Sequence, residues 1–339
     1  MIRLLADADL SALNTFGLPG RARWLAEVDD FDELPGLLRD PRFSGLPRLV
    51  LGGGSNVVLR GGKVDALVIR LCAAGWRIVA RDGTHARIEA DAGMAWHALV
   101  TACVDGGLGG IENLALIPGT VGAAPVQNIG AYGIELESVL HSLDAVDLAS
   151  GEFRTYARAD CALGYRDSIF KHAARGMAIV RVRLDLDAAA PLRCEYRDLR
   201  DEITARGIET PTRRDVYDMV CAIRRRKLPD PAVIGNAGSF FKNPVVSAAG
   251  YAALREHFPD LVAYAQADGS VKLAAGWLID RAGWKGFRDG PVGVHEKQAL
   301  VLVNHGGASG AQVLSLAQRI VDDVRARYGV TLAMEPVVL

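Results

Sequence analysis

The chain has 339 residues, which is enough for about two or three domains rather than one small core. Half of the residues are apolar, fewer than a quarter are charged and the formal net charge is -1, so the charge balance argues against a nucleic-acid or membrane-surface binder. No apolar run approaches the ~18 residues that span a bilayer, and residues 1–10 carry two aspartates instead of the basic start of a signal peptide.

The cysteines and histidines point away from disulfide and metal chemistry. Five cysteines are scattered along the chain without a CxxC pair, so neither a zinc ribbon nor a disulfide framework is indicated. We expect reduced, mostly buried thiols in a reducing compartment, which is the cytoplasm. His295-Glu296 begins like a zinc-protease helix, but Ala299 stands where the second histidine belongs. No metal site is expected.

Short strands are predicted along the first two-thirds of the chain. Residues 47–51, 66–71 and 86–90 are brief apolar runs bounded by loop residues. Residues 96–104 fit a short helix that ends before two glycines. Residues 179–186 alternate apolar with charged side chains, which is the period of a strand with one buried face.

Two longer helices are predicted in the last third. Residues 212–227 have apolar side chains at helical spacing and begin with a Thr-x-x-Asp pair that resembles a cap. They end before the Leu-Pro-Asp-Pro sequence at residues 228–231, where proline forbids a helix and where we place a domain boundary. Residues 309–328 form the longest predicted helix, with Gly329 as its end and a strand over residues 330–334 after it.

The segment Gly52-Gly53-Gly54-Ser55-Asn56 follows a predicted strand and is a candidate phosphate-binding loop. Small residues let backbone N–H groups close around an anionic oxygen. The Rossmann fingerprint is absent, because its third glycine would fall at Val57, and the chain contains no GxxxxGK[ST] sequence. Taken alone, the segment is more simply a tight turn without a ligand.

A second segment, residues 109–133, is rich in glycine and alanine and almost free of charge, yet it keeps Gln127 and Asn128. Such a stretch suits a backbone pressed against a large flat ligand whose polar edges are met by amides. A buried crossover packed on neighbouring strands explains the composition equally well.

These two segments are accompanied by three further blocks and a short N-terminal sequence, Asn14-Thr15-Phe16-Gly17. The blocks are Gly-Tyr-Arg-Asp-Ser-Ile-Phe-Lys at 164–171, Gly-Asn-Ala-Gly-Ser-Phe-Phe-Lys-Asn-Pro at 235–244 and Gln-Ala-Asp-Gly-Ser-Val-Lys at 266–272. Together they resemble the UDP-N-acetylenolpyruvoylglucosamine reductase family, within the vanillyl-alcohol-oxidase-like flavoproteins. The resemblance spans nearly the whole chain.

The resemblance implies an α+β fold with a FAD-binding region of two α/β subdomains (vanillyl-alcohol-oxidase-like, PCMH type) and a C-terminal α+β substrate-binding domain. The expected FAD-binding subdomains are residues 1–66 and 67–222, the second completed by residues 330–339, and the expected substrate-binding domain is residues 228–329. The segment that carries Tyr196 and the intact 164–171 block resemble the family type with an extra substrate-covering loop.

The family resemblance also implies an activity. UDP-N-acetylenolpyruvoylglucosamine would be reduced to UDP-N-acetylmuramate by NADPH through tightly but non-covalently bound FAD, with NADPH and substrate using one site in turn. This is a cytoplasmic step of peptidoglycan precursor synthesis, and so of cell-wall biogenesis. The expected partners are these small molecules alone, without nucleic acid or membrane, and the expected state is a monomer.

Three residues align with the family's catalytic groups. Hydride addition to the enolpyruvyl group leaves an enolate-like charge that needs a cation and then a proton. The resemblance assigns charge stabilisation to Arg166 and Glu335 and proton donation to Ser239. A guanidinium suits a carboxylate, but by residue type alone Arg166 reads as a structural ion pair and Ser239 as a loop serine. A carboxylate beside an enolate repels it, so we expect Glu335 to act protonated or through a neighbour.

The resemblance assigns two further sets of residues. Expected substrate contacts are Tyr165, Tyr196, Lys227, Asn243, Tyr264 and Gln298, with Tyr196 on the covering loop. Expected FAD contacts are Gly52, Gly53, Gly54, Ser55, Asn56, Pro118, Gly119, Gly122, Gln127, Asn128, Ile129 and Gly130. The basic run at 224–227 is explained mostly by its place at a helix C-terminus, where positive charge complements the helix dipole.

Two other functions remain open at this point. One is an FAD-dependent oxidase of the same fold; such enzymes often attach flavin through histidine or cysteine, and neither residue occurs in residues 52–56 or 109–133. The other is a non-catalytic nucleotide-sugar-binding protein. The presence of Arg166, Ser239 and Glu335 together argues against it.

Overall fold

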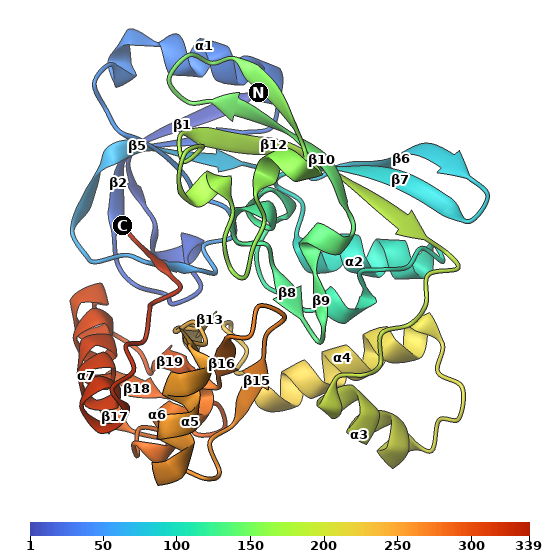
Figure 1. Cartoon of the computed structure of the whole chain (residues 1–339). Helices are drawn as coiled ribbons and strands as arrows, with labels where there is room; N and C mark the ends of the chain where they lie inside the picture. Colours follow the sequence, from blue (N-terminus) through green and yellow to red (C-terminus); the bar gives the residue numbers. More distant parts are fainter. The chain divides into compact units, whose positions relative to one another are not determined.

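The computed structural model describes all 339 residues and divides the chain into two compact units (Figure 1). Unit 1 comprises residues 1–8, 22–53 and 64–226. Unit 2 comprises residues 9–21, 54–63 and 227–339. Each unit therefore combines segments that are far apart in the sequence. The three-part division expected from the family resemblance stays a prediction.

Two sheets make up most of unit 1, and their mixture with helices gives the expected α+β class. The first has the order β1-β2-β5-β3, with strands Ile2–Asp9, Arg21–Val28, Lys63–Leu71 and Arg48–Val50. The second has the order β11-β10-β12-β7-β6, with strands Phe153–Ala157, Leu140–Asp147, Met177–Asp187, His85–Asp91 and Trp76–Asp82. The strands predicted at 47–51, 66–71 and 86–90 are confirmed as β3, part of β5 and part of β7.

Strand β12 confirms the period of two read from the sequence. Val180, Val182 and Leu184 are completely buried, whereas the charged residues between them are not. Its backbone pairs in antiparallel fashion with β10 on one edge and β7 on the other. A central strand with charges on one face needs ion pairs there, and Arg183 meets both Glu89 and Asp144.

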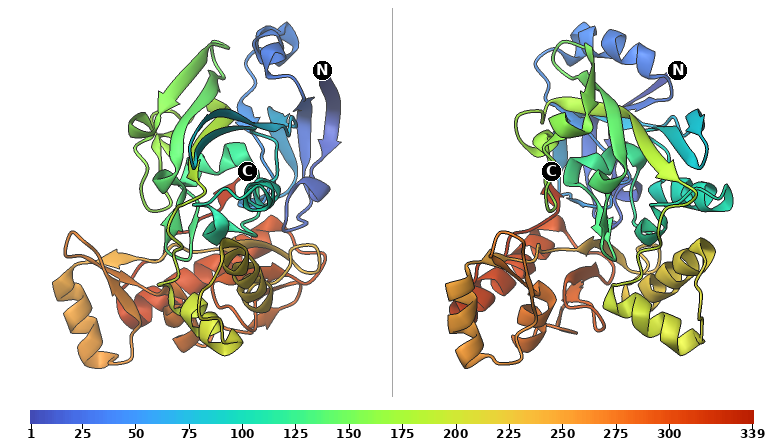
Figure 2. Two further views of the ribbon diagram at one scale, coloured as in Figure 1. Left: turned by 90° about the vertical axis from the view of Figure 1, so that its right-hand side faces the viewer. Right: turned by 45° about the vertical axis from the view of Figure 1, so that its right-hand side comes forward.

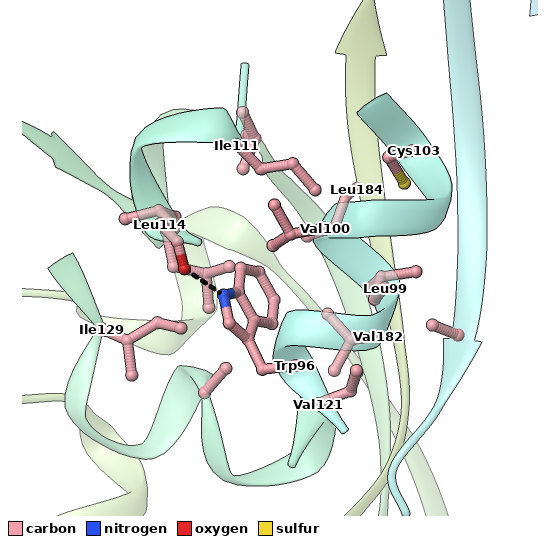
Figure 3. Packing of buried hydrophobic residues seen from close by; sticks show 14 of the residues in the cluster. Trp96, Leu99, Val100, Cys103, Ile111, Leu114, Val121, Ile129, Val182 and Leu184 are labelled. Atoms are coloured by element: carbon pink, nitrogen blue, oxygen red, sulfur yellow. Dashed lines mark hydrogen bonds between the residues drawn. The ribbon is translucent and has the colours of Figure 1, made fainter. Parts of the chain in front are cut away.

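Helix α2, Trp96–Asp105, packs under the curved second sheet (Figure 2). Trp96, Leu99 and Val100 are at most 1% exposed and lie in one core cluster with Val182 and Leu184 (Figure 3). The Trp96 indole N–H donates to the Leu114 carbonyl at 3.0 Å, which joins the helix to the glycine-rich segment that follows it. The helix ends at Gly106, as predicted.

Helix α4, Arg213–Lys227, is also confirmed, together with its cap. The backbone N–H of Thr212 donates to the Asp215 carboxylate at 2.8 Å, and the Asp215 N–H donates to Thr212 Oγ1 at 3.2 Å. The remaining helices of unit 1 are α1, Leu34–Arg39, and α3, Arg197–Arg206. The hairpin of β8, Gly130–Ala131, and β9, Ile134–Glu135, lies in the second glycine-rich segment.

Unit 2 contains three sheets and three helices. The sheets have the orders β13-β19-β18-β17, β14-β16-β15 and β20-β4. Their strands are, in chain order, Val57–Val58, Gly235–Ser239, Val245–Val246, Ala263–Ala265, Val271–Leu273, Arg288–Asp289, Val292–Val294, Val301–Asn304 and Val337–Val338. The helices are α5, Ala248–His257, α6, Ala275–Arg281, and α7, Gly310–Tyr328, the last capped by Ser309 and ended by Gly329 as predicted.

The strand predicted over residues 330–334 is wrong. Val330 and Leu332 are buried and their neighbours exposed, which reproduces the burial pattern of a strand, but only Met334 forms a bridge, with Phe241. A strand appears later, where β20 pairs in parallel with β4. The alternation came from two apolar anchors on an extended segment without a continuous ladder.

The chain contains no helix long and apolar enough to cross a membrane. No group of three or more metal-ligating side chains is present. All five cysteines are unpaired thiols, and Cys103, Cys161 and Cys221 are buried.

Candidate active site

The two glycine-rich segments meet in unit 1. A Cβ atom added to Gly53 would lie 3.0 Å from the Gly119 Cα, and one added to Gly52 would lie 2.9 Å from Thr120 Oγ1. Larger side chains at these positions would force the segments apart. The structure therefore brings together two of the predicted FAD-binding segments, with Pro118 exposed beside them.

Backbone hydrogen bonds fix the second segment against residues 92–96. The Gly119 carbonyl accepts from Trp96 N–H at 3.0 Å, and Gly122 N–H donates to Ala92 at 3.0 Å. A Cβ atom on Gly122 would lie only 2.6 Å from that of Ala92. Gly122 is thus required by packing, so the buried-crossover interpretation holds for this part of the segment.

Asn128 supports the segment from inside the protein. Its side chain is fully buried and donates to Glu135 Oε2 at 3.1 Å and to the Gly164 carbonyl at 3.2 Å, while it accepts from the Glu137 N–H at 3.0 Å. Ile129 beside it is 7% exposed. With these side chains directed into the protein, both residues can offer a cofactor only their backbone.

Arg166 stands on a tight turn between Gly164 and Asp167, which exchange backbone hydrogen bonds at 3.1 Å. Its φ is 54°, a left-handed conformation that costs of order 1–3 kcal/mol for a residue with a side chain. The guanidinium donates to the Gly130 carbonyl at 2.8 Å and lies 5.4 Å from the Tyr165 ring centroid. A strained arginine held on this turn is consistent with a functional position.

Arg224 was not predicted as a site residue, although it belongs to the same region of unit 1. It donates from Nε to the Leu116 carbonyl at 3.2 Å, and Tyr132 lies close enough to affect its charge. Burial lowers the pKa of the Arg224 guanidinium, and the charge of Arg166 lowers it further, whereas the interaction with Tyr132 raises it. Burial raises the pKa of the Tyr132 hydroxyl to about 12. The available signal was spacing, since Arg224 follows Val220 by four residues on the buried stripe of α4.

Tyr196, the predicted residue of the covering loop, directly precedes α3 and is 44% exposed. Its ring packs edge-on against Tyr132 with centroids 5.3 Å apart. An exposed phenol held by a partly buried one can meet a ligand with either its face or its hydroxyl.

In unit 2 the structure brings Ser239 and Glu335 onto adjoining segments. Ser239 ends β13, and the next residue, Phe240, accepts a backbone hydrogen bond from Glu335 N–H at 2.9 Å. Both are partly buried. The Asn56 side chain donates to the Glu335 carbonyl at 3.3 Å, so the first glycine-rich segment ends beside Glu335.

The other predicted substrate residues of unit 2 lie on separate elements. Asn243 Oδ1 accepts from Ala275 N–H at 2.9 Å at the start of α6. Gln298 Oε1 accepts from Leu300 N–H at 3.4 Å, and the Leu300 carbonyl in turn accepts from Phe240. Tyr264 on β15 is 48% exposed, and Lys227 ends α4.

The residues of unit 1 fit a flavin. A Cβ atom at Gly52 or Gly53 would meet Thr120 or Gly119 of the second segment, so glycine lets the two backbones approach closely. The second segment is fixed from behind by buried side chains. The second segment carries almost no charge, which suits an aromatic ring system met by amide groups.

Two family models match the chain. An FAD binding domain matches residues 22–156, and the UDP-N-acetylenolpyruvoylglucosamine reductase C-terminal domain matches residues 230–339. These matches fall on the regions that hold the glycine-rich segments and Ser239 with Glu335, respectively.

Curated and solved relatives agree over the full length. The UDP-N-acetylenolpyruvoylglucosamine reductase of Pseudomonas aeruginosa is 55% identical over 99% of this chain and 98% of its own, and that of Azoarcus sp. is 54% identical over 99% and 98%. The crystal structure of the reductase from Thermus caldophilus matches all of this chain and 98% of its own with a TM-score of 0.65 at 26% identity. The chain therefore belongs to the UDP-N-acetylenolpyruvoylglucosamine reductase family.

Proposed function

We propose that this chain reduces UDP-N-acetylenolpyruvoylglucosamine to UDP-N-acetylmuramate with NADPH through FAD, and that Arg166, Ser239 and Glu335 carry the chemistry. The observation that carries the assignment of roles is the pairing of Ser239 and Glu335 on adjoining segments, 96 residues apart in sequence, with Glu335 N–H bonded to Phe240. A serine and a carboxylate brought together in this way suit proton delivery rather than metal or disulfide chemistry.

The glycine-rich segments would hold FAD. Gly52, Gly53 and Gly119 offer backbone amides at a place where the two segments touch, and Gly54, Ser55, Gln127 and Gly130 continue the two segments on either side. FAD, when bound, supplies hydride transfer from NADPH to the enolpyruvyl group. Burial of Trp96 and Leu114 beneath the second segment keeps that surface rigid.

Arg166 would bind the carboxylate of the enolpyruvyl group. Its permanent charge favours the negative form that develops when hydride arrives, and its two terminal nitrogens can engage both carboxylate oxygens. The bond to the Gly130 carbonyl and the neighbouring Tyr165 ring orient the guanidinium before a substrate arrives.

Ser239 would give the proton, and Glu335 would stabilise the intermediate, either protonated or by polarising a neighbour. An alcohol is a weak acid, but it can donate to a strongly basic carbanion-like centre. The Asn56 bond to the Glu335 carbonyl fixes the segment that carries this carboxylate.

Substrate recognition is assigned to Tyr165, Tyr196, Lys227, Asn243, Tyr264 and Gln298. Exposed Tyr196 and Tyr264 can stack and hydrogen-bond, while Lys227 can meet a pyrophosphate charge. We further propose a monomer in the cytoplasm, since NADPH chemistry and five unpaired thiols suit a reducing compartment. The FAD-binding subdomains remain assigned to residues 1–66 and 67–222 with 330–339, and the substrate domain to 228–329.

An anaerobic titration tests the function. The purified protein is titrated with NADPH while the visible flavin absorption is followed, and UDP-N-acetylenolpyruvoylglucosamine is then added. We expect bleaching by NADPH and recovery of the oxidised spectrum on adding substrate. Recovery only after oxygen is admitted would support the oxidase alternative, and a protein that FAD cannot reconstitute would contradict the flavoenzyme assignment.

A further inference from the structure

Leu116 has a backbone conformation that its residue type disfavours. Its φ is 55°, in the left-handed region, where a residue with a side chain is strained. It lies three residues before Gly119, which touches Gly53. The conformation of Leu116 therefore sets the direction in which residues 117–119 leave the core.

Two side chains from different helices hold the Leu116 backbone. His97 on α2 accepts the Leu116 N–H at Nδ1 at 3.1 Å, and Arg224 on α4 donates to the Leu116 carbonyl at 3.2 Å. The backbone N–H and carbonyl of Leu116 are thus hydrogen-bonded by an imidazole and a guanidinium instead of by other backbone groups. Removing either partner would leave a polar group of a strained residue without its bond.

The His97 ring is itself held in place. It stacks on Tyr217 of α4 with centroids 5.8 Å apart and planes at 12°, and the Tyr217 hydroxyl hydrogen-bonds Thr101 Oγ1 at 2.7 Å. Thr101 Oγ1 donates to the His97 carbonyl at 2.8 Å. The ring therefore has little freedom to leave the Leu116 N–H.

We propose that His97 is a positioning residue for FAD, which with Arg224 holds Leu116 in its left-handed conformation and so presents residues 117–119 to the cofactor. The inference rests on the proposed binding of FAD by this segment. His97 touches the segment from the protein side, and its effect reaches the cofactor through Leu116.

Protonation of His97 opposes this role. The acceptor Nδ1 exists only in the neutral ring, and a protonated Nδ1 would place two donors face to face. Burial, then the charges of Arg225 and Arg224, lower the pKa of His97. The groups facing it are Tyr217, Arg224 and Arg225 of α4, while the Leu116 segment contributes no titratable side chain.

The sign of the pH dependence follows. Because the pKa is lowered in the folded protein, the contribution of His97 is present above the ordinary value of about 6.5 and is lost as the pH falls through the folded pKa. FAD affinity should weaken on acidification through this interval.

The test compares His97→Phe with His97→Asn. Phenylalanine keeps a ring against Tyr217 but has no acceptor, whereas the Asn side-chain oxygen can replace Nδ1. FAD dissociation constants are measured by flavin fluorescence quenching on reconstituted apoprotein between about pH 5 and pH 8. We expect His97→Phe to weaken binding about tenfold at pH 7.5, and His97→Asn to restore it to within about threefold of the natural protein without its acid-dependent loss.

Two further variants serve as a control and as a rescue. His257→Phe, at an exposed position on α5, is the matched control and should leave both affinity and pH profile unchanged. In the His97→Phe background, Leu116→Gly should recover part of the affinity, because glycine adopts a positive φ without strain.

The outcomes separate two failures. If the natural protein binds no FAD, the proposed function itself is overturned. If it binds FAD but His97→Phe binds equally well, or if His97→Asn keeps the acid-dependent loss, only the positioning role is overturned. Should His97→Phe fail to fold, the pH profile of His97→Asn against the natural protein still decides.

Discussion

The role that we propose for Ser239 is one that its chemistry alone does not suggest, since serine seldom acts as a general acid. In the structure it ends β13, and Glu335 is joined to the adjacent Phe240 by a backbone hydrogen bond. If this pair serves proton delivery, the requirement for Ser239 belongs to one half of the reaction only. The two halves can be measured separately.

Replacing Ser239 with alanine should leave the reduction of bound flavin by NADPH nearly intact and slow the reoxidation by substrate by about a hundredfold or more. Anaerobic stopped-flow absorption at the flavin band measures both rates on the same preparation. Ser44→Ala, at an exposed position, is the control and should change neither rate. Equal damage to both half-reactions would contradict the assignment.

Arg166 could be named from its sequence block, but its left-handed backbone and its bond to Gly130 could not. Arg224 and His97 were missed altogether. The helical spacing of Arg224 indicates only that it faces the protein, and the bonds of both residues to Leu116 appear only when α2 and α4 converge there. Through family resemblance, a sequence block assigns residues that are expected to touch ligands. It gives no comparable signal for residues that hold those segments from behind, since tertiary contacts decide them.

The elements with strong periodicity were predicted well. β12, α2, α4 and α7 each followed from apolar spacing and end signals, because their burial depends on one regular face. Residues 330–334 failed for the opposite reason: two buried side chains imitated a strand without a ladder. The helices α3, α5 and α6, with weaker signals, were not predicted.

An ion pair on the charged face of the second sheet gives the second prediction. Asp144 on β10 accepts hydrogen bonds from Arg183 at 3.0 Å and from Thr155 at 2.7 Å. Burial acts to raise the pKa of Asp144, but the bonds from Arg183 and Thr155 outweigh it and hold the pKa below its ordinary value. The carboxylate therefore stabilises the fold above about pH 4, and this contribution is lost as the pH falls through the folded pKa.

Asp144→Asn should lower the free energy of unfolding by roughly 1–3 kcal/mol at pH 7. The difference from the natural protein should shrink on acidification below about pH 4. Urea denaturation at several pH values measures both effects. Asp65→Asn removes an exposed pair with Arg23 and should cost less than about 1 kcal/mol. A pH-independent difference at Asp144 would rule out the electrostatic explanation.

A close backbone contact gives the third prediction. In Gly122→Ala the new methyl group would lie 2.6 Å from the Ala92 Cβ and 2.9 Å from the Ile179 carbonyl. We expect a loss of roughly 1–3 kcal/mol in unfolding free energy from overpacking, with weaker retention of FAD. Gly176→Ala is the matched control, because a Cβ atom added there would have no atom within 4 Å outside its chain neighbours. Similar melting curves for both variants would show that the second segment can shift freely.

At the scale of the whole chain, the family and its FAD-dependent activity follow from full-length relatives. The fold class was predictable because ordered blocks extend over most of the sequence. The interleaving of the two units was not, because nothing in residues 9–21 or 54–63 signals that they join residues 227–339. Only tertiary contacts reveal it, such as the bond from Thr15 Oγ1 to the Asn236 carbonyl at 2.6 Å.

The expected state is a single chain. Sedimentation velocity at micromolar concentration should give one species near 36.2 kDa, with or without FAD. A concentration-dependent shift toward twice that mass would contradict the monomer assignment.

The interleaving has a consequence for how the protein is made. Residues 9–21 and 54–63 leave the ribosome early, yet their partners begin only at residue 227. At ~5–20 residues per second, the wait is roughly ten to forty seconds. During that time Phe16, Leu18 and Leu59, fully or almost fully buried in the finished protein, have no core to enter. Newly made chains should therefore expose these apolar side chains for that time, and completion of unit 2 must follow translation of its last segment.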